Sequence, residues 1–106
     1  MINTSPILNV SKAYTDKDPN RSIYNVMLQL GSETGEMQDW INRPWRQKEE
    51  FAGECADVIN CVVDALWLYF RSKHPGLSDD EISKLVVYKL NRQIVLKTKK
   101  WADAVL

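Results

Sequence analysis

The sequence predicts an all-α protein, built as a helical bundle whose core is completed by oligomerisation. Apolar residues recur at helical spacing through most of the chain, and no stretch alternates apolar and polar residues long enough for a strand. With 106 residues, of which only 4 are Gly and 4 are Pro, the chain fits one domain with few interruptions. A helical chain this short buries a modest core alone, which favours association with further copies.

The first half of the chain predicts one irregular segment and one helix. Residues 1–20 are expected to be the least regular part, because Pro6 and the run at 15–20 supply breakers and caps, with room for a short helix around residues 8–14. From Ser22, a suitable N-cap, helical periodicity predicts a helix that ends at residues 42–44. Its apolar positions are Ile23, Val26, Met27, Leu30, Met37 and Ile41.

The second half predicts two further helices. One is expected to start near Gln47 and run to about Ser72, and its stretch 58–70 is apolar on nearly every side. Such a helix is buried on more than one face, as at a bundle centre or a subunit interface. Ser78 and Glu81 form a capping-box pattern, which predicts a last helix from about residue 79. It either continues to the end of the chain or breaks near residue 98.

Charge and cysteine content narrow the class of protein. Lys and Arg number 14 and Asp and Glu number 14, so the chain lacks the basic excess needed to hold nucleic acid, although a small anionic ligand is not excluded. Cys55 and Cys61 lie six apart in one predicted helix, where a disulfide would be geometrically poor. We therefore expect reduced thiols in a cytoplasmic protein with no membrane partner.

Two pairs of acids stand out. Glu33 and Glu36 are three residues apart, as are Glu54 and Asp57, and this spacing puts both members of a pair on one helix face. Apolar neighbours one turn away place these acids at or near the packed side, where unpaired carboxylates are costly. A hard divalent cation would resolve that cost, with Mg²⁺ as the default and Mn²⁺ as a substitute. The alternative is that the acids simply solvate a helix face.

At these motifs the sequence resembles the MazG-like all-α nucleoside triphosphate pyrophosphatases. That family carries ExxE on one helix and ExxD on the next; here ETGE at 33–36 is followed, after 17 residues, by ECAD at 54–57. The surrounding words LQLGSETGEMQDW and GECADVIN are similar as well, and the resemblance spans about residues 22–97. It implies that the four acids are Mg²⁺ ligands and catalytic residues, in a helical bundle assembled as a homodimer or homotetramer.

The resemblance also implies a reaction, the hydrolysis of a nucleoside or deoxynucleoside triphosphate to the monophosphate and pyrophosphate in nucleotide-pool house-cleaning. Related activities in the same superfamily, a phosphoribosyl-ATP pyrophosphohydrolase or a dUTPase, are alternatives. A non-catalytic helical dimerisation module is the alternative from a different class, and it predicts neither metal binding nor turnover.

Substrate contacts are expected from three further regions. By resemblance, the late basic segment holds the phosphates through Lys89, Asn91, Arg92 and Lys97. Asn60, one turn beyond Asp57, either contacts substrate or satisfies its neighbours as a buried amide. Trp45, between the two acid motifs, either stacks on a base or packs in a core or interface.

Overall fold

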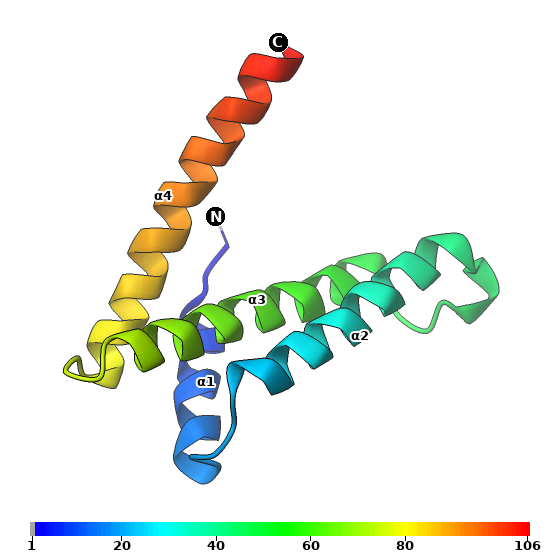
Figure 1. The fold of residues 1–106 in the computed structure, drawn as a ribbon. Coiled ribbons are helices and arrows are strands. Elements are labelled where there is room, and N and C mark those ends of the chain that lie inside the picture. Colours follow the sequence, from blue (N-terminus) through cyan, green and yellow to red (C-terminus); the bar gives the residue numbers. More distant parts are fainter. Residues whose placement is uncertain (1) are drawn as a thin grey trace.

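The computed structural model describes residues 2–106 and is helical through most of their length (Figure 1). No β-strand occurs within these residues, which confirms the all-α class. The elements are α1 (Ser5–Lys17), α2 (Ile23–Asn42), the short 3-10 helix η1 (Pro44–Arg46), α3 (Phe51–Lys73) and α4 (Asp79–Val105).

Helices α2 and α3 form the centre of the structure. They lie side by side and run in opposite directions, because η1 reverses the chain between them (Figure 1). Helix α1 packs across α3 near the start of α2, and the first turns of α4 pack on the end of α3 (Figure 1). The core lies where these elements meet, and its fully buried side chains are Trp67, Ile82, Val63 and Val86.

Capping explains where the helices begin. Ser22 precedes α2, as expected, and its backbone N–H donates to the Asn25 side chain at 3.3 Å. Ser78 and Glu81 form the predicted capping box at the start of α4, with reciprocal hydrogen bonds of 3.1 and 3.2 Å. Hydrogen bonds that Ser78 donates to the Glu81 carboxylate, first of all the 3.1 Å bond from its backbone N–H, favour the charged form and lower the pKa of Glu81. Helix α4 then continues without a break through Thr98 to Val105.

Two boundaries differ from the sequence prediction. The segment expected to be irregular contains α1, whose 13 residues tolerate Pro6 because it lies in the first turn, where its missing N–H is not needed. Helix α3 starts at Phe51 rather than near Gln47, since residues 47–50 form a link outside the helix. The Gln47 side chain is bonded instead to the Trp40 carbonyl oxygen at 2.9 Å.

The single chain has an open shape. Its radius of gyration is 15.6 Å, whereas a compact chain of this length is expected near 13 Å. Its accessible surface of 7925 Å² exceeds the roughly 6,100 Å² expected for a compact monomer of this mass. The second half of α4 accounts for much of this openness, because it projects away from the other helices (Figure 1). Within residues 2–106 no helix is long and apolar enough to cross a membrane.

Candidate metal-binding site

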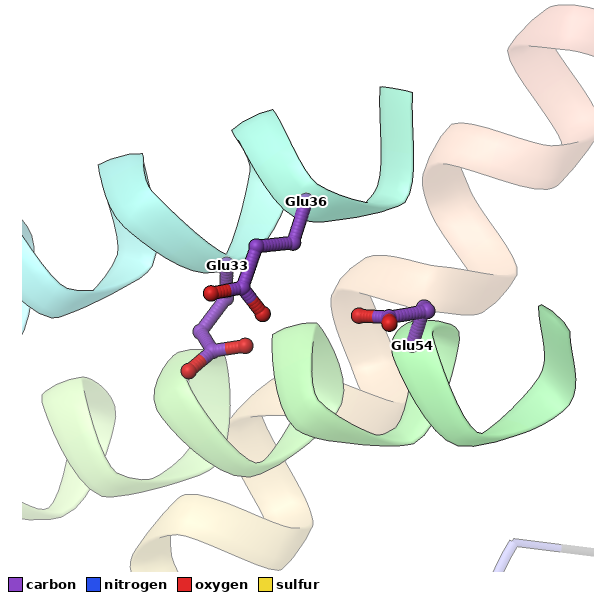
Figure 2. Close-up of side chains that lie close together, drawn as sticks. All are labelled: Glu33, Glu36 and Glu54. Atoms are coloured by element: carbon purple, nitrogen blue, oxygen red, sulfur yellow. The ribbon is translucent and has the colours of Figure 1, made fainter. Parts of the chain in front are cut away.

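The two predicted acid motifs face each other across the α2–α3 pair. Figure 2 shows Glu33 and Glu36 from α2 and Glu54 from α3 directed into the same space between the helices. Each of these three carboxylates offers an oxygen within 4.8 Å of the oxygens offered by the other two. The antiparallel arrangement brings together residues about 20 positions apart in sequence, so helix packing, not local spacing, creates this cluster.

The cluster contains carboxylate oxygens without hydrogen-bond donors. Glu33 Oε1 accepts a bond of 2.7 Å from Gln29 Nε2, whereas Glu33 Oε2 is buried and has no partner among the described residues. Glu54 Oε2 is in the same situation. Among the described residues, no salt bridge involves Glu33, Glu36 or Glu54. Two buried oxygens without donors, beside a third carboxylate, fit the donor set of a hard divalent cation.

Electrostatic crowding is greatest at Glu54. Partial burial raises the pKa of this carboxyl, and the nearby charges of Glu49 and Glu36 raise it further. Asp57 contributes in the same direction. A group whose charged form is disfavoured in this way gains most from a nearby positive charge, so Glu54 is the natural centre of a cation site.

Glu49 is a further acid that the sequence motifs did not include. It forms a second close group with Glu54 and Asp57, in which oxygens again lie within 4.8 Å of one another. Its carboxylate lies over Gly53, where an added Cβ would be 3.0 Å from Glu49 Cδ. Since Glu49 lies in the link before α3, no helical spacing could have marked it. The absence of a side chain at Gly53 leaves room for it.

Two positive side chains, Arg46 at the end of η1 and Lys48 in the link before α3, lie beside the cluster. A pocket of about 200 Å³ is lined by three acids, Glu36, Asp39 and Glu54, together with Trp40, Arg46 and Lys48. Arg46 Nη1 is 3.2 Å from Asp39 Oδ2, which holds the guanidinium at the pocket wall. No sequence pattern identifies Arg46 and Lys48 as phosphate-binding candidates. Only the packing of α2 against α3 shows that they lie beside Glu36 and Glu54.

The predicted neighbours Asn60 and Trp45 lie outside the acid cluster. Asn60 is exposed and lines a different cavity, between α1 and α3. Trp45 lies in η1 and is 80% exposed, so it is not a core residue of this chain. The neighbouring Trp40 instead packs on Phe51, with ring centroids 5.0 Å apart.

The predicted phosphate-binding residues of α4 are not brought to the acids within one chain. Lys89, Asn91, Arg92 and Lys97 are exposed on α4, and none of them lines the pocket beside Glu36 and Glu54. Asn91 lies instead beside Asn3 and Thr4 of the N-terminal segment, and Arg92 Nη1 donates to the Tyr88 hydroxyl at 3.4 Å. None of the four belongs to either close group of acids.

Comparisons with family models, curated proteins and solved structures returned no match for this chain. The chain is an all-α protein in which carboxylates of two helices form a cluster and two basic side chains, Arg46 and Lys48, lie beside it.

Proposed function

We propose that this chain is a divalent-cation-dependent nucleoside triphosphate pyrophosphohydrolase of the MazG-like kind, which releases a nucleoside monophosphate and pyrophosphate. The observation that carries this proposal is the convergence of Glu33, Glu36 and Glu54 from two helices, with oxygens within 4.8 Å. Carboxylates packed this closely repel one another unless a cation lies between them.

The donor set favours Mg²⁺, with Mn²⁺ as a substitute. The ligands are all carboxylate oxygens, which hard cations prefer, and no imidazole or thiolate belongs to either close group of acids. Glu33, Glu36 and Glu54 would hold one ion, and Asp57, which belongs to the second close group, would hold another together with Glu54. Glu49 is placed to share a second ion through Glu54. Bound there, the cation would polarise phosphate oxygens and favour ionisation of a water molecule.

The adjoining pocket supplies the second requirement of a triphosphate site. Lys48, which forms no salt bridge among the described residues, lines it next to Glu36 and Glu54. Arg46 lines it as well and is half exposed beside Asp39, so an anionic substrate would meet Lys48 first and could draw Arg46 from its exposed ion pair. In the reaction, a water oxygen bonds to the α-phosphorus and the bond from that phosphorus to the α,β-bridging oxygen breaks. A carboxylate of the cluster accepts the water proton, while Arg46 and Lys48 stabilise the negative charge of the departing pyrophosphate.

The proposed enzyme is a homo-oligomer. A stable interface buries roughly 800 Å² on each partner. The accessible surface of the open chain exceeds that of a compact monomer of the same mass by more than this area. One candidate contact is an open, apolar groove between α2 and α3, where Met27 and Tyr69 are exposed. The groove is lined by Ile23, Met27, Leu30, Val62, Ala65, Leu66 and Tyr69. As the resemblance implies, Lys89, Asn91, Arg92 and Lys97 of α4 would serve the acids of a neighbouring copy.

The decisive test is release of pyrophosphate from each common ribonucleoside and deoxyribonucleoside triphosphate, with Mg²⁺ and with EDTA. We expect release from at least one nucleotide with Mg²⁺ and none with EDTA. Glu36→Gln and Asp57→Asn should abolish turnover, whereas the matched control Asp103→Asn, on the exposed end of α4, should retain it. If no nucleotide releases pyrophosphate, the chain is not this enzyme, and the non-catalytic helical module becomes the better explanation.

A further inference from the structure

A cavity on the opposite end of the α2–α3 pair from Arg46 and Lys48 has no role in the function proposed so far. It encloses about 300 Å³ between α1 and α3, within the size range of small-molecule sites. Its wall is apolar on the α1 side, where Ile7, Val10 and Tyr14 line it. Its polar wall is formed by Arg21, Asn60 and Asp64.

The polar groups in this cavity are charge-neutral as a set. The Arg21 side chain is only 5% exposed and pairs with Asp64. It also donates to the Ser11 carbonyl oxygen at 3.2 Å and to the Thr15 hydroxyl at 3.3 Å. Because these bonds occupy the guanidinium and Asp64 balances its charge, the cavity does not favour an anion. It suits a flat, uncharged ligand that carries hydrogen-bond donors and acceptors.

Two polar side chains, Asp64 and Asn60, have hydrogen-bonding capacity left for such a ligand. Asp64 is anchored through Oδ2, and its Oδ1 is buried in the cavity wall without a hydrogen-bond partner among the described residues, so a ligand would have to reach into the wall to bond to it. The Asn60 amide is exposed at the cavity, and an amide presents both a donor and an acceptor. A hydroxyl or amino group would satisfy the carboxylate oxygen, and the amide matches the edge of a nucleobase.

This cavity shares part of its wall with a second cavity that reaches α2. A second cavity of about 450 Å³ shares Tyr14, Arg21 and Asp64 with the first and extends to Gln29 on α2. Gln29 Nε2 in turn donates to Glu33 Oε1 at 2.7 Å. Gln29 therefore links the wall of the second cavity to the acid cluster.

The groups follow one line along the helix pair. On α2, Gln29 lines the second cavity, and Glu33 and Glu36 follow at the acid cluster. Trp40 comes last, in the pocket that Arg46 and Lys48 also line. On α3, Asp64 follows Asp57 by seven residues, which corresponds to a rise of about 10 Å along the helix axis. A nucleoside triphosphate has the same order of parts: an uncharged nucleoside, the reacting α-phosphate, and the terminal phosphates.

We propose that the paired cavities around Arg21 and Asp64 hold the nucleoside of the substrate, with the α-phosphate at the acids and the terminal phosphates toward Arg46 and Lys48. This inference rests on the proposed function, because it takes the acid cluster as the place of reaction. The apolar wall formed by Ile7, Val10 and Tyr14 would contact the base, and Asn60 and Asp64 would bond to the base and sugar.

The test fills the first cavity without touching the acids. Val10→Trp places an indole at a residue that is 65% exposed and lines the cavity, whereas Val95→Trp makes the same change at a residue that is 68% exposed on α4. We expect Val10→Trp to raise the KM about tenfold or more, a loss of about 1.4 kcal/mol in binding. Val95→Trp should leave the KM unchanged, and Asn60→Ala should shift it in the same direction as Val10→Trp.

A binding experiment separates this inference from the proposed function. In EDTA, uncharged nucleosides should shift the amide resonances of Tyr14, Asn60 and Asp64, and Val10→Trp should remove those shifts. Mn²⁺ affinity, which reports on the acids, should be equal in Val10→Trp and wild type. Pyrophosphate release with an unchanged KM in Val10→Trp would overturn the nucleoside site and leave the function standing. Nucleoside binding without pyrophosphate release would support the site and remove the hydrolytic function.

Discussion

The indole Nε1 of Trp40 donates a hydrogen bond of 2.7 Å to the carbonyl oxygen of Glu49. This bond ties the end of α2 to the link before α3, and the Trp40 ring packs on Phe51 at the same place. It therefore fixes the backbone that carries Glu49. The carboxylate of Glu49 lies close to those of Glu54 and Asp57, with oxygens within 4.8 Å of one another.

Trp40→Phe should loosen this link. Phenylalanine keeps an aromatic ring beside Phe51 but loses the donor, so we expect a loss of about 1 kcal/mol in the free energy of unfolding. Mn²⁺ affinity should fall in parallel, because Glu49 is held less firmly. Urea unfolding and Mn²⁺ titration measure both effects. Trp45→Phe is the matched control, since Trp45 is 80% exposed, and an equal effect of the two changes would contradict this role for Trp40.

Glu54→Gln should alter the pH dependence of stability in the metal-free protein. Burial and neighbouring acids raise the pKa of Glu54 above its ordinary value of 4.5. The folded protein therefore binds this proton more tightly than the unfolded chain, and stability falls as the pH rises from about 4.5 through the raised pKa. Thermal melts in EDTA should show this decline in wild type and a flatter profile in Glu54→Gln. Parallel profiles would show that Glu54 is not the crowded group.

Gly53→Ala should have opposite effects on stability and cation binding. Alanine favours a helix by about 1 kcal/mol over glycine, and the new Cβ would lie 3.0 Å from the Glu49 carboxyl carbon. The flexible Glu49 side chain would move aside, so we expect a more stable metal-free protein with weaker binding of a second cation. Calorimetric Mn²⁺ titration of both proteins measures this. Gly35→Ala is the control, because nothing lies near its added Cβ.

Arg21→Met should destabilise the fold by leaving the Asp64 carboxylate without its partner. The Arg21 side chain is 5% exposed and that of Asp64 21%, so we expect a loss of about 2 kcal/mol, less than for a fully buried pair. The double change Arg21→Met with Asp64→Leu should recover much of this loss, because no unpaired charge remains. Chemical unfolding of the single and double variants measures the coupling, and a double variant as unstable as Arg21→Met would contradict it.

Met27→Lys should dissociate the proposed homo-oligomer. Met27 lines the apolar α2–α3 groove and is 42% exposed, so lysine is tolerated in the single chain but costly when the groove is covered. Light scattering after size exclusion should give a smaller mass for Met27→Lys than for wild type. Ser32→Lys adds the same charge at an exposed position of α2 outside the groove and should leave the mass unchanged. A monomeric wild type would refute the oligomer.

Local sequence signals were sufficient to predict helix boundaries that depend only on neighbouring residues. The capping box at Ser78 and Glu81 marked the start of α4, and Ser22 and Pro44 bounded α2, because caps and breakers act on their own backbone. The first 20 residues were misjudged because breakers at both ends of α1 outweighed the weak amphipathic pattern between them. Packing on α3, which buries Leu8, supports this helix, and packing overrides weak propensity.

By itself, the sequence determined the helical class and the two acid pairs, because the spacing of three residues fixes which side chains share a helix face. Only the tertiary structure decided that Glu33 and Glu36 face Glu54, that Glu49 joins them over Gly53, and that Arg46 and Lys48 lie beside them. It also paired Asp64 of α3 with Arg21, which precedes α2. These relationships depend on the register between antiparallel helices and on a non-helical link, and a periodic sequence pattern contains neither.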